Sequence, residues 1–580
     1  MRYKILQKIN IQSIVMRQII ECVPNISEGN NENIINQVVA EIEKIEGVKL
    51  LDVDPGKTTN RTVITFVGEP EQVCQSAFLV VKKAQELIDM RGHHGDHPRF
   101  GATDVCPLIP VANITMEEVV EYARKLAQRI ATELEIPVYC YENAAFKPER
   151  KNLAVCRQGE YEALSNRISS QDQAPDFGPK QWNEKVAKSG ATAVGARDFL
   201  LAVNYNLNTT STRRANAIAF DVREKGRKMR EGGKPNGKVI LDENGKAKWQ
   251  RGTLKGTKAI GWYIEEYGIA QVSMNITNAN QTPLHVCFDE VCDKAAKRGI
   301  RVTGVEIVGL VPKKTLIDAG KHYLAKQQRS LGVDEDTLIR IAVKSMGLDD
   351  LKPFVAKEKV IEYMIEDNSQ KRLIDLTCKG FANETASESP APGGGSISAY
   401  VGSLSAALAT MVANLSSHKP GWDDRWQEFS DVAEKGQTIK DDLLHLVDED
   451  TNAFNKIMNA FSLPKKTEEE KALRSMAIQE ATKYAIEVPF KTLQRSFDCF
   501  EICEQMIEMG NPNSVTDAAV GVLCARTACI GAFMNMKINC ASLEDKDFVA
   551  DILAKGQKLV DEACRIEKEY TAKVMEMISK

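Results

Sequence analysis

The spacing of hydrophobic and polar residues in the first third of the chain alternates between the two periods of regular structure. From Met16 to about Val203, short β-rich runs are separated by longer stretches whose apolar positions recur three and four residues apart. The short runs predict strands at 18–23, 48–53, 62–67 and 138–141, and the longer stretches predict helices at 71–90 and 116–134. This alternation predicts an α/β unit.

A second unit with the same alternation runs from about Ala196 to Ile365. We expect strands at Phe199–Val203, Ala270–Ile276 and Val302–Val308, and helices at Leu284–Arg298 and Lys313–Gln328. The first two thirds of the chain therefore predict two α/β subdomains, 16–195 and 196–365, each an α+β sandwich-like layer of sheet and helices.

The pattern changes after a polar stretch at 366–372, which we interpret as a linker. From 373 to 580, long patterns of period 3.6 dominate and strand signals are few. A run of Ala and Ser follows Ala391-Pro-Gly-Gly-Gly-Ser396, and small residues at that density allow helices to approach closely. Long helices are expected at 423–461, 467–509, 514–540 and 546–579. The last third predicts an all-α domain.

Composition and charge narrow the function classes. The chain is 43% hydrophobic and 27% charged with a formal net charge of −4, so no global field favours nucleic acid or an anionic membrane. Its 14 cysteines are scattered, which is typical of reduced thiols in a cytoplasmic protein. Residues 1–15 form an N-terminal extension that is either a weak targeting segment or, as we favour, untranslated sequence before a start at Met16.

The most informative polar cluster is His93-His94-Gly95-Asp96-His97-Pro98-Arg99, which holds three of the seven histidines. An unperturbed imidazole, with a pKa of about 6.5, is the side chain best placed to move protons at cellular pH. Gly95 and Pro98 prevent a regular helix, so the spacing of His93 and His97 does not predict a metal site, and no Cys-x-x-Cys pair supports one. An acid/base loop is the leading interpretation, and a structural histidine cluster is the main alternative.

The helical third contains one carboxylate at an unusual position. Asp450 lies seven residues after Leu443, four after Leu446 and four before Phe454, which places it on the apolar stripe of a helix. Desolvation raises the pKa of such a carboxyl and suits it to proton exchange near neutral pH. The alternatives are a buried aspartate held by hydrogen-bond donors, or one at a subunit boundary.

A basic segment, Arg223–Lys258, stands out in the second subdomain. It carries 12 Lys and Arg residues against 4 Asp and Glu, and Val239-Ile-Leu-Asp-Glu-Asn-Gly245 predicts a hairpin. The segment, which we call the basic arm, is either a solvated surface excursion or an electropositive site for a polyanionic ligand.

Many longer motifs occur in one order along the chain. The first two thirds contain Glu21-Cys-Val-Pro-Asn-Ile-Ser-Glu-Gly29, Leu51-Asp-Val-Asp-Pro-Gly56, Thr59-Asn-Arg-Thr62, His97-Pro-Arg-Phe-Gly-Ala-Thr-Asp-Val-Cys-Pro107, Ala174-Pro-Asp-Phe-Gly-Pro179, Gly261-Trp-Tyr263 and Gly309-Leu-Val-Pro312. The last third contains Ala391–Ser396, Leu446-Val-Asp-Glu-Asp450 and Leu463-Pro-Lys465. From Met16 to its end, the chain resembles the formimidoyltransferase-cyclodeaminase family.

The resemblance implies two consecutive reactions without redox chemistry or a metal. A formimino group passes from N-formimino-L-glutamate to N5 of tetrahydrofolate, and N10 then closes on the formimino carbon with loss of ammonia. Tetrahydrofolate, expected as the polyglutamate, is thus a co-substrate. The resemblance also implies two α/β subdomains followed by an up-and-down helical domain, assembled as a homo-oligomer.

The resemblance also assigns residues. The transferase base maps onto His97 and the cyclodeaminase acid/base residue onto Asp450, while Arg99 is expected to clamp a substrate carboxylate and Asp54 to orient the formimino group or the imidazole. Folate contacts are expected from two segments, through Gly178, Pro179, Gly190, Leu254, Lys255, Gly256 and Gly261. The basic arm is then expected to bind the glutamate tail of folate.

Two other functions stay open from the sequence. One is a folate-dependent transferase that uses N-formylglutamate, with an altered or inactive helical domain. The other is a folate-binding protein without turnover, against which the retention of both candidate proton-transfer residues argues. Nucleic-acid binding through the basic arm is a weaker alternative that salt-sensitive RNA retention would reveal.

Overall fold

The computed structural model describes residues 18–365 and 372–580, except residues 58, 96 and 235. They form two compact units, the first made of residues up to 319 with 342–365 and the second of 320–341 with 372–580. Three predicted features lie outside the described residues. They are the extension 1–15, Asp96 of the histidine cluster, and the linker apart from Arg372. Each unit is considered separately below.

The first subdomain is built on a seven-stranded mixed sheet. Its strands are β1 (Ile19–Cys22), β2 (Asn25–Ile26), β3 (Val48–Gly56), β4 (Arg61–Gly68), β5 (Thr103–Ala112), β6 (Val138–Glu142) and β7 (Thr192–Ala196). The short strands β1 and β2 both lie between β4 and β5, with β3 beyond β4, while β7 and β6 continue the sheet in parallel beside β5. The antiparallel half therefore brings the loop after β2 and the loops before β4 and β5 to one region.

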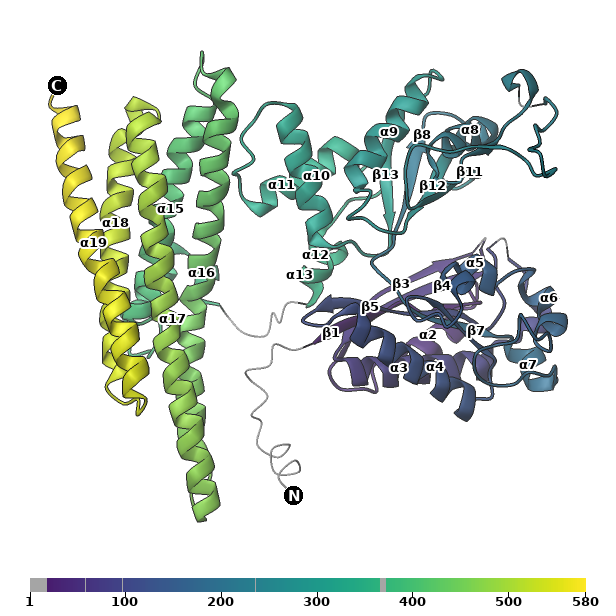
Figure 1. Cartoon of the computed structure of the whole chain (residues 1–580), viewed down its shortest axis with the longest axis horizontal. Coiled ribbons are helices and arrows are strands. Elements are labelled where there is room, and N and C mark those ends of the chain that lie inside the picture. The colour runs from purple at the N-terminus through teal and green to yellow at the C-terminus, as the bar shows by residue number, and fades with distance from the viewer. Residues whose placement is uncertain (1–17, 58, 96, 235, 366–371) are drawn as a thin grey trace. The chain divides into compact units, whose positions relative to one another are not determined.

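Two amphipathic helices cover one face of this sheet, α3 (Pro70–Leu87) and α4 (Met116–Glu133) (Figure 1). Thr115 and Glu118 form a reciprocal capping box that fixes the start of α4. Fully buried side chains such as Phe66 and Leu108 fill the space between helices and sheet. Shorter helices complete the subdomain: α2 (Glu32–Val39), α5 (Leu153–Cys156), α6 (Glu160–Arg167) and α7 (Glu184–Ser189).

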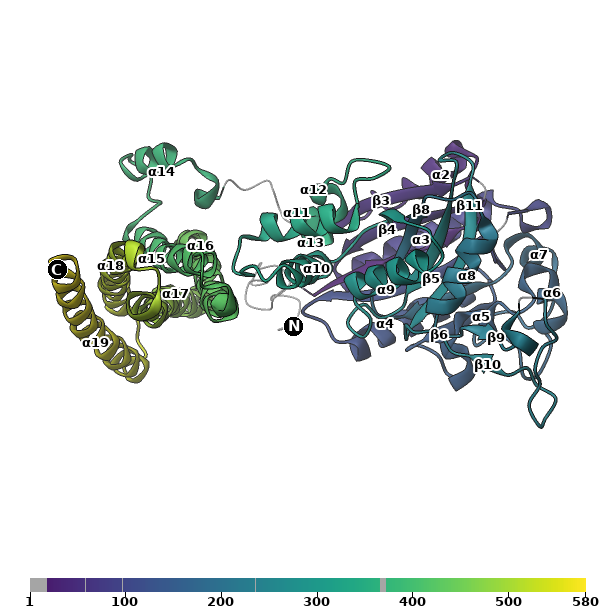
Figure 2. The same cartoon turned by 90° about the horizontal axis from the view of Figure 1, so that it is seen from above.

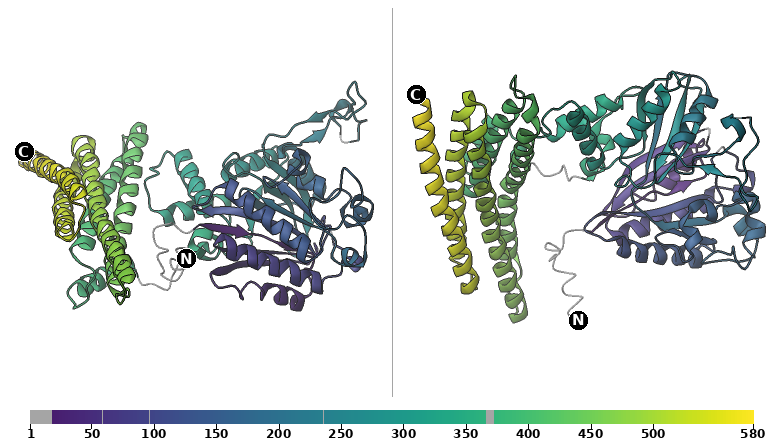
Figure 3. Two further views of the ribbon diagram at one scale, coloured as in Figure 1. Left: turned by 60° about the horizontal axis from the view of Figure 1, so that its bottom comes forward. Right: turned by 45° about the horizontal axis from the view of Figure 1, so that its top comes forward.

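The second subdomain has a four-stranded antiparallel sheet in the order β11 (Thr257–Ile264), β12 (Ile269–Ile276), β8 (Leu201–Leu207) and β13 (Val302–Val308). Helices α8 (Thr212–Val222) and α9 (Leu284–Ala296) pack on this sheet, and Tyr205 meets Phe288 of α9. The chain then forms α10 (Lys313–Lys326), α11 (Glu335–Met346), α12 (Ala356–Lys359) and α13 (Ile361–Ile365). The basic arm projects from this subdomain as a hairpin through β9 (Arg227–Lys228) and β10 (Trp249–Gln250) (Figure 3).

The second unit is a bundle of long helices, which Figure 2 shows nearly end-on. After α14 (Cys378–Thr385) come α15 (Gly394–Ser417), α16 (Trp426–Ser462), α17 (Glu468–Met509), α18 (Val515–Cys540) and α19 (Lys546–Ile578). Small residues let the helices approach: a Cβ on Gly436 would lie 2.1 Å from Oγ1 of Thr410, and one on Gly402 would lie 2.6 Å from Oγ of Ser496. The predicted up-and-down helical architecture is confirmed.

Most predicted elements are present, with ends shifted by a few residues. The strand predicted at Phe199–Val203 is β8, which begins at Leu201 and ends at Leu207. The prediction missed β5 because Pro107 and Pro110 interrupt its pattern, although burial on both faces tolerates them. It also missed β11, which begins where the basic arm ends. The many charged residues there hide the alternation of buried and exposed positions.

Two helices of the second unit are long and apolar enough to be considered as membrane spans. By length and composition alone, α15 and a segment that includes α18 each qualify as candidate spans. Inside the bundle, 61% of the α15 window and 39% of the other window are buried. Burial against neighbouring helices accounts for the apolar character of α15.

Candidate active sites

His97 lies in the loop that leads into β5, and its side chain is half-buried. Its Nδ1 is 2.8 Å from the carbonyl oxygen of Pro98. Because a carbonyl oxygen only accepts, Nδ1 of the neutral ring carries the proton. This contact leaves Nε2 as the free basic nitrogen.

The surroundings of His97 favour the neutral imidazole. Burial lowers the pKa of His97 from its ordinary 6.5 to about 4, and the nearby Arg61 and Arg157 add to the effect. The carbonyl of Pro98 and the carboxylate of Asp104 oppose it. The ring is therefore a free base at neutral pH, rather than the group half-protonated near 6.5 that the sequence suggested.

Asp104 holds two arginines beside His97. Its fully buried carboxylate accepts from Nη1 of Arg61 at 2.6 Å and Nη1 of Arg157 at 2.8 Å through one oxygen, and from the N–H of Phe100 through the other. Nη1 of Arg157 also donates to the carbonyl of Pro98, the same oxygen that His97 contacts. Within the described residues, Nε and Nη2 of Arg157 have no hydrogen-bond partner, so two donors next to the imidazole stay available.

The contacts of Arg99 differ from those expected of a residue that clamps a substrate carboxylate. Its buried guanidinium forms a bidentate pair with Glu162 at 2.7 and 2.9 Å and also contacts Glu160. Its remaining donors reach Nδ1 and the carbonyl oxygen of His93. Every guanidinium nitrogen of Arg99 is thus engaged within the protein, which leaves none to clamp a substrate carboxylate in this arrangement.

The other two histidines of the cluster hold the loops together. Nε2 of His93 lies 2.9 Å from the carbonyl of Asn60, and the side-chain amide of Asn60 donates to the carbonyl of His94. Asn60 also accepts from the N–H of Gly29. A Cβ on Gly95 would meet the carbonyl of Thr59 at 2.3 Å, so the loops pack too closely for any other residue.

Asp54 lies elsewhere in the same subdomain, on β3 opposite Val63. Burial raises the pKa of Asp54, and Asp52 raises it further, while Lys359 lowers it. No hydrogen bond joins Asp54 to His97 among the described residues. In the described part of the chain, the Nδ1 of His97 is held by the carbonyl of Pro98 and not by Asp54.

The sheet of the second subdomain carries a network of polar side chains. Asn206 and Gln271, both fully buried, are joined by a 2.8 Å hydrogen bond. Trp262 donates to Gln271, and Asn206 donates to Asp350. Buried amides that are paired in this way form a fixed polar network inside the subdomain. Trp262 belongs to one of the sequence motifs, and this network gives that motif a structural reason.

In the first predicted folate segment, two glycines are required by the conformation of the backbone. Gly178 and Gly190 have φ of 85° and 65°, in the left-handed region that favours glycine. A Cβ on Gly190 would lie 2.2 Å from the carbonyl of Phe100, so Gly190 supports the loop that carries His97. Gly178 is exposed and Pro179 half-buried, so this part of the segment is open to a ligand.

The second predicted folate segment begins at the end of the basic arm. Leu254 is buried, whereas Lys255 is exposed, so that an anion can reach the Lys255 ammonium. Gly256, with φ of 62°, begins the turn into β11. Gly261 packs against α8, where a Cβ would lie 2.2 Å from the backbone nitrogen of Asn216. Lys255 is therefore the one side chain of the predicted set, among the described residues, that is suited to ligand contact by charge.

In the helical unit, Asp450 of α16 faces the start of α15. Its Oδ2 is 3.0 Å from Oγ of Ser396, and the backbone N–H of Ser396 also donates to the carboxylate. Burial raises the pKa of Asp450, while both contacts with Ser396 oppose that rise. The half-buried carboxyl thus has the desolvated character that the helical projection predicted.

The glycine-rich stretch has a direct role in this geometry. A Cβ on Gly395 would lie 2.1 Å from Oδ1 of Asp450, so only glycine lets the carboxylate sit against α15. A Cβ on Gly394 would lie 3.1 Å from the amide nitrogen of Asn535 on α18. Three helices therefore meet at Asp450, Gly395 and Asn535.

The two acids before Asp450 serve other contacts. Asp448 accepts from the backbone N–H of Leu373 at 2.6 Å, and Glu449 accepts from the hydroxyl of Tyr484. Consecutive carboxylates on one helix therefore point to three different partners, and Asp450 alone faces the glycine-rich stretch. Among the described residues, no group of three His, Cys, Asp or Glu side chains is placed to hold a metal ion.

Comparison with known proteins decides the family. Three family models match in order: the formiminotransferase domain, N-terminal subdomain, at residues 19–197; the formiminotransferase domain at 202–366; and formiminotransferase-cyclodeaminase at 377–558. The mouse formimidoyltransferase-cyclodeaminase is 39% identical over 549 residues, covering 94% of this chain and 97% of the mouse protein.

The chain belongs to the formimidoyltransferase-cyclodeaminase family.

Partial relatives match separate parts of this family architecture. A glutamate formimidoyltransferase from Streptococcus pyogenes is 41% identical over 53% of this chain and 94% of its own length. A methenyltetrahydrofolate cyclohydrolase from Methylorubrum extorquens is 35% identical over 32% of this chain and 90% of its own length. Pieces of the formimidoyltransferase-cyclodeaminase architecture therefore occur as separate proteins.

Sequence reasoning missed the residues that set the charge around the imidazole, namely Arg61, Asp104 and Arg157. Two of them lie inside motifs that were already apparent, Thr59-Asn-Arg-Thr62 and the long motif that starts at His97. Arg157 lies in no such motif, and only the fold brings it to Pro98. Asn535 in the helical unit likewise had no sequence signal.

Proposed function

We propose that this chain transfers the formimino group of N-formimino-L-glutamate to N5 of tetrahydrofolate and then cyclises the product to 5,10-methenyltetrahydrofolate with release of ammonia. The main support for this proposal is that all three family models match the chain, in order, across both units. Two desolvated proton-transfer groups, His97 and Asp450, lie in separate units and fit two separate steps.

In the first step, His97 acts as the general base. N5 of tetrahydrofolate attacks the formimino carbon, and Nε2 of His97 accepts the proton that N5 loses. The bond from that carbon to the glutamate nitrogen then breaks, and the imidazolium returns the proton to the departing nitrogen. The low pKa keeps the imidazole unprotonated at neutral pH and therefore available as a base, and an anionic substrate beside it stabilises the imidazolium that forms.

The substrate of this step carries carboxylates that need a cationic partner. Arg157 offers two free donors beside His97, whereas the guanidinium of Arg99 is engaged by Glu160 and Glu162. We therefore transfer the clamping role from Arg99 to Arg157. Asp54 then faces the folate or the cationic formimino group rather than the imidazole.

In the second step, Asp450 exchanges protons at nitrogen. N10 attacks the formimino carbon and loses its proton, and the amino group on that carbon gains one and leaves as ammonia. A carboxyl with a raised pKa can serve both transfers near neutral pH. The N-terminus of α15 and Ser396 hold the carboxylate in place.

Folate is held, in this proposal, by the two predicted segments, with Lys255 and the basic arm on the polyglutamate tail. The exposed arm residues Lys225 and Lys228 already lie over the ring of Trp249, which keeps cationic groups together at one face of the hairpin. Neither step needs a metal. The reaction serves histidine degradation in the cytoplasm, which the fourteen free thiols support.

The proposal also includes a homo-oligomer. On α15, Leu404, Met411 and Leu415 expose 42%, 38% and 47% of their surface at helical spacing. On α18, Val520 and Leu523 are exposed to a similar extent. Apolar stripes of this kind on adjacent helices fit a subunit interface of the helical unit.

A coupled assay tests this function. Purified protein is given formiminoglutamate and tetrahydrofolate, and ammonia and the absorbance of methenyltetrahydrofolate are followed together. Equal amounts of both products are expected. Transfer with N-formylglutamate but no ammonia from formiminoglutamate would contradict the proposal, as would folate binding without turnover of either donor.

A further inference from the structure

His93 lies four residues before His97 and is only 8% exposed. Its ring lies between two loops: Nε2 is 2.9 Å from the carbonyl oxygen of Asn60, and Nδ1 is 3.3 Å from Nε of Arg99. Nη2 of Arg99 also donates to the carbonyl oxygen of His93. The transfer step proposed above assigns no role to this side chain.

The partners of the His93 ring fix its protonation state. A carbonyl oxygen only accepts, so Nε2 carries the proton, and a guanidinium nitrogen only donates, so Nδ1 is the unprotonated acceptor. The ring is therefore the neutral imidazole. A second proton would have to bind Nδ1, where it would meet the N–H and the positive charge of Arg99. Protonation of His93 is thus incompatible with its contact to Arg99.

The charges that face the ring oppose its protonation. Burial lowers the pKa of His93 from its ordinary 6.5, and Arg99 and His94 lower it further, while the carbonyl of Asn60 and the carboxylate of Glu28 oppose the change. On α6, the two carboxylates that pair with Arg99 keep that guanidinium in place. Because the pKa is lower in the packed loops than in an unfolded chain, the packed arrangement loses stability as the pH falls below about 6.5.

The two partners of this ring adjoin the groups that support the proposed base. Asn60 directly precedes Arg61, whose charge helps to lower the pKa of His97. Arg99 directly follows Pro98, whose carbonyl oxygen contacts Nδ1 of His97. The neutral ring therefore connects the loop that sets the charge at the base to the loop that carries it.

Asn60 depends on contacts of this kind. Its φ is 45°, in the left-handed region that residues other than glycine adopt at a cost. Its side chain accepts from the N–H of Gly29 and donates to the carbonyl of His94. The N–H of Gly29 therefore reports whether Asn60 keeps its position.

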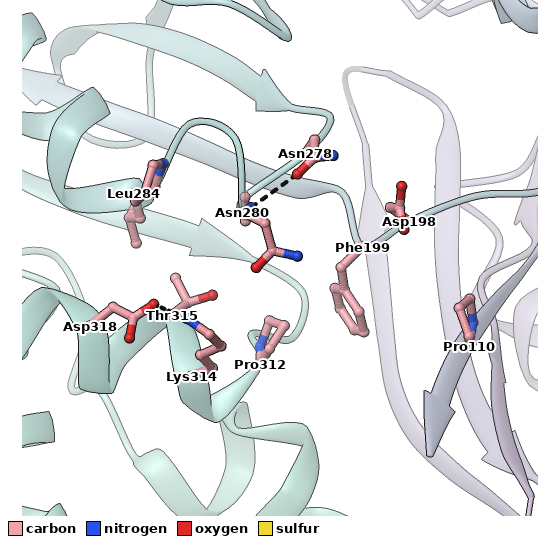
Figure 4. A pocket seen from close by; sticks show the side chains of 12 residues that line it. Pro110, Asp198, Phe199, Asn278, Asn280, Leu284, Pro312, Lys314, Thr315 and Asp318 are labelled. Atoms are coloured by element: carbon pink, nitrogen blue, oxygen red, sulfur yellow. Dashed lines mark hydrogen bonds and ion pairs between the residues drawn. The ribbon is translucent and has the colours of Figure 1, made fainter. Parts of the chain in front are cut away.

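The groups around His93 are separate from the cavity of about 230 Å³ in Figure 4. That cavity is lined by other residues, among them Pro110, Phe199 and Pro312. A ligand in it would not touch the contacts of His93.

We propose that His93 is a positioning residue for formimino transfer, which holds the loop of His97 to the loop of Arg61 only while its ring is neutral. This inference rests on the proposed function of His97 as the transferase base. Transfer then decreases in acid through two protonations, one of His97 itself and one of His93.

The pH dependence of transfer tests this role. His93→Gln keeps an N–H donor for the carbonyl of Asn60 but cannot gain a proton. The ratio of kcat/KM at about pH 5 to that at about pH 7.5 is expected to be at least about threefold higher in this variant than in the unaltered chain. His94→Gln removes the exposed neighbouring imidazole and is the matched control, with the pH profile of the unaltered chain.

His93→Ala removes both ring contacts. It is expected to lower kcat/KM for transfer by at least about tenfold at both pH values, because the loop of the base is no longer fixed. Cyclisation of supplied 5-formimino-tetrahydrofolate should be retained, which also shows that the variant is folded in its helical unit.

Hydrogen exchange supplies a readout that does not depend on catalysis. In the unaltered chain, after correction for the intrinsic rate, the N–H of Gly29 is expected to exchange at least about threefold faster at about pH 5 than at about pH 7.5. Peptides that cover residues 28–31 are measured by mass spectrometry. His93→Gln should abolish this difference, and the unaltered chain alone carries the test if that variant fails to fold.

The proposal is overturned if His93→Gln and the unaltered chain have the same pH profile, if His94→Gln changes the profile as much, or if exchange at Gly29 in the unaltered chain does not depend on pH. His97→Ala is assayed in parallel. Undiminished transfer in His97→Ala would refute the proposed function of His97, whereas loss of transfer there with an unchanged profile in His93→Gln would refute this inference alone.

Discussion

The two candidate sites use one physical effect on opposite kinds of group. Burial disfavours the charged form, so it lowers the pKa of the His97 imidazole and raises that of the Asp450 carboxyl. The first group becomes a free base at neutral pH, and the second becomes a carboxyl that protonates more readily. Partial burial therefore prepares each group for proton transfer.

The means of support differ between the sites. His97 lies on a loop, and its field is set by two arginines that Asp104 fixes. Asp450 lies on a long helix and is held by the start of a second helix, and it has no ion pair with any residue that the structure describes. The loop site is thus tuned by charge and the helical site by close packing, so each should respond to a different kind of change.

Removal of the proton-transfer groups should separate the two activities most strongly. His97→Ala is expected to lower formimino transfer by about 100-fold or more, because it removes the proposed general base, and to leave cyclisation of supplied 5-formimino-tetrahydrofolate intact. Asp450→Asn should do the reverse. Separate assays of the two steps on each variant make the measurement. Loss of both activities in one folded variant would refute the assignment of one step to each site.

Gly395→Ala tests packing at the helical site. The new Cβ would lie 2.1 Å from Oδ1 of Asp450, so the carboxylate must move, and cyclisation is expected to fall by about 10- to 100-fold with transfer unchanged. Gly393→Ala is the matched control, since its Cβ would meet only the carbonyl of Pro390 at 3.9 Å. Equal activity in both variants would show that the contact of Gly395 with Asp450 is unimportant.

The sequence singled out the two candidate proton-transfer groups but not the neighbouring groups that shift the pKa of His97. Helical spacing alone placed Asp450 on a partly buried face, because residues on the neighbouring turns of the same helix determine that position. The arginines beside His97 come from β4 and from the turn after α5, and the loops meet only through the sheet order. The partners of Arg99 could not be predicted for the same reason, since Glu160 and Glu162 are about 60 positions away.

Arg157→Gln tests charge at the loop site and should have a moderate effect. Removing this cation makes the imidazolium less unfavourable, so the pKa of His97 is expected to rise from about 4 toward 6.5. The acid limb of kcat/KM for transfer should then move upward by up to about 1 pH unit. Arg91→Gln, at an exposed pair with Asp89, is the control and should leave the limb in place. A limb that stays fixed or moves downward in Arg157→Gln would contradict this account.

The smallest expected effect comes from Ser396→Ala at the helical site. The Ser396 hydroxyl lowers the pKa of Asp450, so its loss should raise that pKa further, while the backbone N–H contact persists. Protonated Asp450 should then persist to higher pH, and the part of the kcat/KM profile for cyclisation that reports Asp450 should shift upward by less than about 1 pH unit. Ser398→Ala is the control, because it removes a hydroxyl two residues further along α15 that donates to the carbonyl of Gly394 rather than to Asp450. A downward shift in Ser396→Ala would mean that a contact other than this hydroxyl controls the carboxyl, and the contrast between a charge-tuned and a packing-tuned site would need revision.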